Sequence, residues 1–207
     1  MDPVPALLGR AHPVMPVITV EQGDDVRTLA DCLEASGVTT LEITLRTGFG
    51  LQAIRDIKQH APGLTVGAGT VMNPVQVRAV VDAGGEFLVS PGFSDAVLAE
   101  ARKLAIPYLP GCATPTEMMT IRDSGLSCAK LFPAEIVGGV ALLQAVAPVM
   151  ADLKFCPTGG IDATNAARYL ALDNVVCVGG SWICPAAAIQ AGDWSQITRL
   201  AGALITG

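Results

Sequence analysis

The chain repeats one pattern about eight times along its length: a short apolar run, followed by a segment with helical periodicity. In the helical segments the apolar residues recur every three or four positions, whereas the runs between them are apolar almost throughout. Continuous apolarity is typical of parallel strands, because helices cover both faces of a parallel sheet. The pattern therefore restricts the chain to the α/β class. The runs predicted to be strands are residues 13–20, 39–46, 64–69, 86–90, 107–111, 128–132, 153–160 and 175–180.

Eight strand–helix units favour a (β/α)8 TIM barrel, with a short amphipathic helix at residues 3–11 before the first strand. The alternative, a doubly wound open sheet, normally has fewer strands. The last helical stretch, residues 186–205, reads as one helix. No linker or charge run divides the 207 residues, so we expect a single barrel domain over residues 1–207.

Composition narrows the partners and the location. The net charge of −6 and the lack of a basic run argue against nucleic acid and anionic membranes. No apolar run approaches the ~20 residues of a membrane span. The six cysteines lack paired spacing and no signal peptide is evident, which favours reduced thiols and a cytoplasmic location. The only histidines, His12 and His60, lack ligands at metal-binding spacing, so no metal is expected.

Catalytic groups of such barrels lie at the carboxyl ends of the strands. In LEITLR, alternation puts Glu42, Thr44 and Arg46 on one face and three apolar residues on the other, so the polar face is predicted to point into the barrel. One interpretation is a structural Glu42–Arg46 pair. The other is a buried carboxylate that shuttles protons, with Arg46 as a bidentate clamp for a substrate carboxylate.

A single lysine, Lys130, stands in the run CAKLF among apolar neighbours and shares a strand face with Cys128 and Phe132. Burial disfavours the charged form of an amine, and a neutral amine can attack a ketone. Alternatively, the lysine is a permanently charged partner of Glu42. Spacing alone leaves both interpretations open.

Paired glycines end the last two predicted strands, in CPTGGID and VCVGGSW. The loops after strands seven and eight commonly bind phosphate in this fold, through backbone N–H groups and a helix N-terminus. We expect Asp162 to cap the helix after the first pair, as Ser94 and Thr114 are expected to cap two earlier helices. These loops therefore predict a phosphate site.

Several of these motifs occur together in a known family. The strings PVMPVI, LEITLRT, VGAGTV, SPG, KLFPAE, FCPTGG and GGSW follow one another in this order. The sequence resembles the 2-keto-3-deoxy-6-phosphogluconate (KDPG) aldolases, class I aldolases of the Entner–Doudoroff pathway, from about Pro13 to Trp194. One departure is Leu131, where members often have an aromatic residue. It falls on the side of the strand that faces the helices, so it affects packing rather than chemistry.

The resemblance implies a role for each matching residue. Lys130 would form a Schiff base with the substrate ketone and Glu42 would be the general acid and base. The remaining contacts would be Arg46 and Thr70 to the pyruvyl carboxylate, Pro91 and Phe132 along the pocket wall, Thr158 to the sugar-acid hydroxyls, and Gly159, Gly160, Gly180 and Ser181 to phosphate.

The resemblance also implies the partners. The substrate would be a phosphorylated 2-keto-3-deoxy sugar acid, the product pyruvate and the assembly a homotrimer. No cofactor is required, because a protonated imine withdraws the electrons itself. Rival functions are an aldolase for the galactonate epimer or for 4-hydroxy-2-oxoglutarate, a phosphate-binding barrel isomerase, and a non-catalytic sugar-phosphate binding protein.

Overall fold

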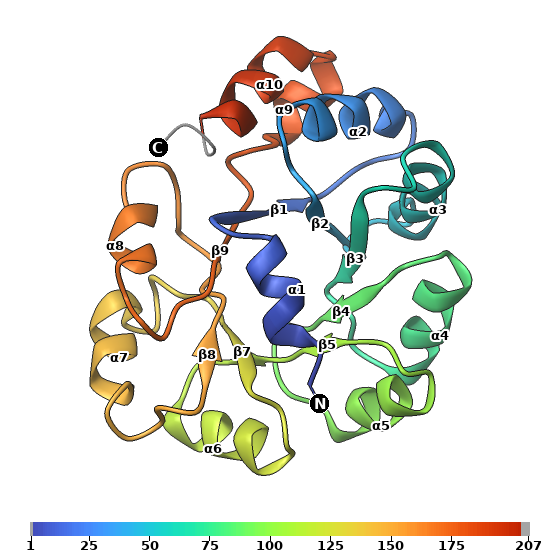
Figure 1. The fold of residues 1–207 in the computed structure, drawn as a ribbon. Coiled ribbons are helices and arrows are strands. Elements are labelled where there is room, and N and C mark those ends of the chain that lie inside the picture. Colours follow the sequence, from blue (N-terminus) through green and yellow to red (C-terminus); the bar gives the residue numbers. More distant parts are fainter. Residues whose placement is uncertain (1, 204–207) are drawn as a thin grey trace.

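Residues 2–203 are described by the computed structural model, which gives an α/β fold with a curled parallel sheet (Figure 1). The strands are β1 (Val14–Ile18), β2 (Thr40–Thr44), β3 (Thr65–Gly69), β4 (Phe87–Val89), β5 (Tyr108–Leu109), β6 (Gly111–Cys112), β7 (Cys128–Leu131), β8 (Lys154–Phe155) and β9 (Val178–Gly180). The helices are α1 (Val4–Arg10), α2 (Val26–Ala35), α3 (Gly50–His60), α4 (Pro74–Asp82), α5 (Asp95–Lys103), α6 (Pro115–Asp123), α7 (Gly139–Val146), α8 (Ala166–Leu170), α9 (Ala186–Ala191) and α10 (Trp194–Gly202).

The strands form two parallel sheets rather than the single eight-stranded barrel expected. One sheet has six strands in the order β5-β4-β3-β2-β1-β9, and the other has three in the order β6-β7-β8. Isolated parallel bridges, Phe155 with Val175 and Thr158 with Gly179, connect the second sheet to the β9 side of the first. In Figure 1 the helices α2 to α10 lie outside the strands.

Two expected elements are interrupted, each at a residue that explains the break. The run at residues 107–111 is divided into β5 and β6 at Pro110, which has no N–H to contribute to a ladder. The last helix is divided into α9 and α10 at Gly192, whose φ of 64° is left-handed and ends α9. Residues 204 and 205, the end of the helix expected at 186–205, lie outside the described residues.

The expected helix caps are partly confirmed. Ser94 caps α5, and Thr114 caps α6 in a capping box with Glu117. Asp162 does not cap α8, whose N-cap residue is Asn165; Asp162 instead accepts hydrogen bonds from the N–H and hydroxyl of Thr164. The helix after the first glycine pair thus begins later than the sequence indicated.

The buried apolar side chains form two clusters. The larger cluster lies between the strands and the surrounding helices and includes Ile43, Val66 and Leu131. The smaller cluster joins side chains of α1, among them Leu8, to side chains on the opposite face of the strands, among them Met15 and Phe87. In Figure 1 α1 lies across the centre of the strand arrangement, so this helix covers one end of the sheet interior.

Within residues 2–203, no helix is both long enough and apolar enough to span a bilayer.

Candidate active site

Two buried charged side chains meet inside the curled sheet. Lys130 on β7 places its Nζ 3.3 Å from both carboxylate oxygens of Glu42 on β2. The side chains are 7% and 1% exposed respectively. Because charges buried this deeply are costly unless they are paired, each residue requires the other. The partner of Glu42 is therefore Lys130, and the Glu42–Arg46 pair that LEITLR also allowed is not formed.

The surroundings of the lysine are apolar. Its ammonium lies 5.6 Å from the centroid of the Phe132 ring, a cation–π distance. Cys128, two residues earlier on the same face, is buried, and this burial raises the pKa of its thiol to about 12. Cys128 therefore stays protonated near neutral pH and does not compete with the lysine as a nucleophile.

Two further buried thiols lie in the same cluster as Cys128. The Sγ atoms of Cys156 and Cys177 are 3.6 Å apart. The hydrogen bond to Cys156, followed by burial, raises the pKa of Cys177 well above its ordinary value. These thiols are packing residues in this structure.

A cavity of about 290 Å³ opens beside the Lys130–Glu42 pair, at the carboxyl ends of the strands. Most of the residues that the sequence assigned to substrate or phosphate line it, and they come from four different strand ends. They are Arg46, Phe132, Thr158, Gly159, Gly160 and Ser181. The structure thus brings together groups separated by more than a hundred positions in the chain.

Two of the polar side chains at this cavity, those of Arg46 and Thr158, differ in exposure. Arg46 is exposed, and across residues 2–203 its guanidinium has no ion-pair partner, so its donors are free for an anion. Thr158 is 7% exposed, and its hydroxyl occupies the space that a β-carbon on Gly179 would fill. Gly179 therefore allows Thr158 to point into the cavity.

Five predicted site residues do not line the cavity. Lys130 and Glu42 are buried next to it, since the ring of Phe132, which lines the cavity, lies 5.6 Å from Nζ of Lys130. The other three are Thr70, Pro91 and Gly180. Thr70 and Pro91 follow β3 and β4, and the carbonyl of Pro91 lies against Gly111. Gly180 faces away, because a β-carbon there would overlap the ring of Trp182. Thr70 has a φ of 64°, a conformation that is strained for a β-branched residue. Backbone strain of this kind is common at functional sites.

Three residues at the cavity were missed by the sequence analysis: Val17, Thr19 and Ile161. Gly179, which also lines it, belongs to the glycine pair of VCVGGSW that the sequence assigned to the phosphate loops. Thr19 shares a 2.8 Å hydrogen bond with the buried hydroxyl of Thr44. Alternation along PVMPVITV carried the signal for two of them, since it puts Val17 and Thr19 on one face of the first strand.

The glycine turn after β8 is supported by a neighbouring loop. Glu135 donates its backbone N–H to the carbonyl of Gly159 at 3.1 Å, and its carboxylate accepts a short hydrogen bond from the hydroxyl of Tyr169. Burial, with the hydrogen bond and charge of Glu135, raises the pKa of Tyr169. Gly160 has a φ of 77°, and a β-carbon there would lie 2.8 Å from Cβ of Glu135. The turn therefore requires glycine at this position.

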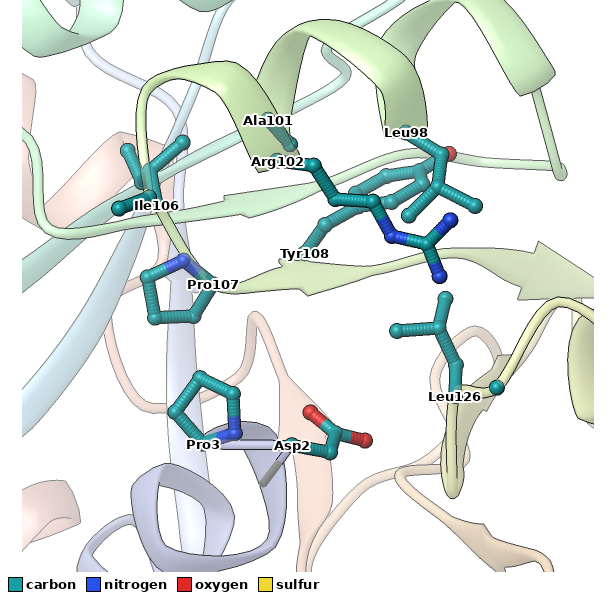
Figure 2. A pocket seen from close by; sticks show the side chains of 11 residues that line it. Asp2, Pro3, Leu98, Ala101, Arg102, Ile106, Pro107, Tyr108 and Leu126 are labelled. Carbon is teal, nitrogen blue, oxygen red and sulfur yellow. The ribbon is translucent and has the colours of Figure 1, made fainter.

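A larger cavity, of about 450 Å³, lies between α5, β5 and the residues that precede α1 (Figure 2). Its charged groups already have partners, because Asp2 accepts hydrogen bonds from the N–H and hydroxyl of Ser127 and Arg102 donates to the carbonyl of Ser124. The walls are mainly apolar side chains such as Leu98 and Leu126. Despite its size, this cavity lacks the convergent free polar groups of a reactive site.

The curled parallel sheet and the buried lysine–carboxylate pair beside an open cavity define a class: α/β proteins equipped for chemistry on a carbonyl compound by an internal lysine. The family model "KDPG and KHG aldolase" matches residues 7–200. The chain belongs to this aldolase family.

Individual relatives are similar along most of their length. A 2-dehydro-3-deoxy-phosphogluconate aldolase from Pseudomonas aeruginosa is 46% identical over 193 residues, which cover 93% of this chain and 88% of the relative. A KHG/KDPG aldolase from Escherichia coli K12 is 47% identical over 195 residues, 94% of this chain and 92% of the relative. The crystal structure of a KDPG aldolase from Legionella pneumophila, with pyruvate captured as a covalent carbinolamine intermediate, superimposes with a TM-score of 0.93. It is 42% identical, and the match covers 97% of each chain.

Proposed function

We propose that this protein is a class I aldolase that cleaves KDPG reversibly to pyruvate and glyceraldehyde 3-phosphate. The observation that carries the proposal is the buried Lys130, held 3.3 Å from both oxygens of Glu42 beside a cavity that Arg46 lines. Membership of the family and the carbinolamine in the Legionella relative support a lysine that attacks a ketone.

The reaction begins when the neutral amine of Lys130 attacks the C2 ketone of the substrate. Loss of water from the carbinolamine gives an iminium ion. Glu42 takes the proton of the C4 hydroxyl, the C3–C4 bond breaks, and its electrons move into the iminium to give an enamine while glyceraldehyde 3-phosphate leaves. Glu42 then protonates C3, and water hydrolyses the imine to release pyruvate and restore the lysine.

The other residues would hold the substrate lengthwise. Arg46, with Thr70, binds the pyruvyl carboxylate, and Pro91 and Phe132 bound the pocket. Thr158 contacts the sugar-acid hydroxyls. The backbone of Gly159, Gly160 and Gly180, with Ser181, binds the phosphate, and Gly179 fits this group better than Gly180 because it lines the cavity. Fixing both ends of a substrate can contribute several kcal/mol to catalysis.

Reductive trapping tests the Schiff base. Pyruvate with borohydride should add one stable adduct to the peptide that contains Lys130, detected by mass spectrometry. The Lys130→Arg variant is the control and should take up no adduct. If the wild type cleaves KDPG while Lys130 stays unmodified, the Schiff-base mechanism is refuted. Isomerase activity without trapping would support the rival phosphate-binding isomerase.

A second candidate substrate is 4-hydroxy-2-oxoglutarate, because the E. coli relative is named a KHG/KDPG aldolase. Comparing kcat/KM on KDPG, its galactonate epimer and 4-hydroxy-2-oxoglutarate identifies the preferred substrate. We expect the highest value for KDPG. Ligand-induced stabilisation without turnover of any of the three would favour the non-catalytic binding protein instead.

We also infer a closed (β/α)8 barrel and a homotrimer. Supporting the barrel, β5 and β6 are separated only by Pro110, and the two isolated bridges link β8 to β9. Supporting assembly, several large apolar side chains are exposed: Met72, Val75, Met119, Ile136 and Val149. Light scattering should give three times the chain mass of 21.3 kDa, and a monomer would refute the trimer. The cytoplasmic location and the single domain over residues 1–207 stay predictions.

A further inference from the structure

Two glycines on β3 face the same side of the sheet as Glu42. Gly67 lies in register between Glu42 on β2 and Phe87 on β4. Gly69 lies two residues further along β3, in register with Thr44. Neither glycine has a positive φ, so the backbone conformation does not demand glycine at either position. The reason for two glycines on one face must be the space they leave.

Each space is filled by a different side chain. A β-carbon on Gly67 would overlap the ring of Phe87, which is 1% exposed. A β-carbon on Gly69 would overlap the carboxylate of Glu42, lying 2.6 Å from its Cδ and 2.8 Å from its Cγ. Because the ring occupies the space over Gly67, the Glu42 side chain extends along β3 and rests over Gly69.

We propose that Gly69 is a positioning residue, which sets the position of the Glu42 carboxylate along β3 by offering a side-chain-free surface on which that carboxylate rests. Its absent side chain lets the two carboxylate oxygens stay 3.3 Å from Nζ of Lys130. The catalytic meaning of this role rests on the proposed aldolase function, while the steric role does not.

A methyl group at position 69 would move the carboxylate rather than the strand. The carbonyl of Gly69 accepts a 2.8 Å hydrogen bond from the N–H of Leu45, and β3 is paired on both sides, so its backbone is held. The Glu42 side chain has rotatable bonds and is the softer partner. A displacement on the order of 1 Å is enough to lower an enzymatic rate by about 100-fold.

The first experiment compares Gly69→Ala with the wild type. We expect kcat for KDPG cleavage to fall about 100-fold, with borohydride trapping of pyruvate at Lys130 retained. Deuterium exchange into the methyl group of pyruvate should slow in parallel, because that exchange needs the base but no sugar phosphate. A Gly69→Ala protein with wild-type kcat would overturn the proposal.

The decisive measurement is a double-mutant cycle with Glu42→Ala. Without the carboxylate there is nothing for the methyl to displace, so Gly69→Ala should not lower the residual exchange rate further in that background. An equal fold-loss in both backgrounds would show that the methyl acts elsewhere, and would overturn the proposal.

Gly67→Ala is the stability comparison on the same face of the same strand. Its methyl meets a buried ring instead of a flexible chain, so it should lower the thermal midpoint more than Gly69→Ala does. If Gly69→Ala is the more destabilising and its activity follows the folded fraction, the residue is merely structural and the proposal is wrong.

The test separates this inference from the aldolase itself. A wild type that folds but neither cleaves KDPG nor exchanges pyruvate protons refutes the proposed function. In that case the double-mutant cycle is measured on the urea midpoint of unfolding. Gly69→Ala should lower this midpoint in the chain that contains Glu42 and leave it unchanged in the Glu42→Ala chain. Equal destabilisation in the two would refute the steric role of Gly69 independently.

Discussion

At the scale of single residues, the pairing of Lys130 with Glu42 places both an amine and a proton acceptor in a water-poor interior. Such a pair is a poor source of stability, because removing two charges from water offsets most of their attraction. Its retention at 3.3 Å, next to an open cavity, is better explained by reactivity.

Thr70 is a residue whose backbone conformation lowers the stability of the fold. Its φ of 64° is unfavourable for a β-branched residue and costs on the order of 1–3 kcal/mol. We predict that Thr70→Gly raises the free energy of unfolding by about 1 kcal/mol, since glycine relieves this strain but is more flexible when unfolded. Urea denaturation measures the change.

The companion variants isolate the hydroxyl. Thr70→Ala keeps the β-carbon and should leave the stability close to that of the wild type, while both variants should raise KM for substrate by removing the hydroxyl. A less stable Thr70→Gly protein would contradict the assignment of strain to this residue.

At the scale of elements, alternation along the predicted strands predicted the central pair of the candidate site. It put Glu42 and Lys130 on inward faces, and the glycine turns placed the cavity at the ends of the last two strands. It could not show that the Phe87 ring lies over Gly67 and the Glu42 carboxylate over Gly69, because those contacts depend on the register of three strands. The positive φ of Thr70 and the late start of α8 were likewise invisible, since both depend on how the loops pack.

The capping box of α6 has a predictable dependence on pH. The Ala113 N–H, together with the N–H and hydroxyl of Thr114, donates to the Glu117 carboxylate and holds its pKa below the ordinary 4.5, although partial burial opposes this. A carboxylate with a lowered pKa stabilises the fold above its unfolded pKa, and this contribution is lost as the pH falls through the folded pKa.

We therefore predict that Glu117→Gln lowers the free energy of unfolding by about 0.3–1 kcal/mol at pH 7, the usual size of the interaction between a carboxylate and a helix N-terminus. The difference from the wild type should shrink as the pH falls below 4.5 and through the lowered pKa of Glu117. Urea midpoints of both proteins between pH 3 and pH 7 test this. A difference that persists unchanged at pH 3 would rule out the ionised carboxylate as its source.

At the scale of the whole molecule, α1 closes the interior opposite the cavity. Leu8 on this helix is fully buried in the cluster that contains Met15 and Phe87. We predict that Leu8→Ala lowers the free energy of unfolding by about 2–5 kcal/mol, through lost burial and the cavity left behind. The matched control is Leu104→Ala, because Leu104 is 38% exposed. Its effect should stay within about 0.5 kcal/mol.

Urea denaturation of the two leucine variants shows whether α1 is packed into the core or only loosely attached to it. If Leu8→Ala costs no more than Leu104→Ala, then α1 contributes little to the core. The sequence predicted this helix as an amphipathic segment before the first strand. What lies beneath it could not be read from the chain, because its contacts come from strands spread over most of the fold.

The position of α1 also determines the order in which the two products leave. With one end of the interior filled, the proposed substrate must arrive and depart through the same mouth. Its pyruvyl half binds at Lys130, and its phosphorylated half remains nearer the glycine turns and solvent. Because the interior is open at one end, the aldehyde half leaves first and pyruvate follows it.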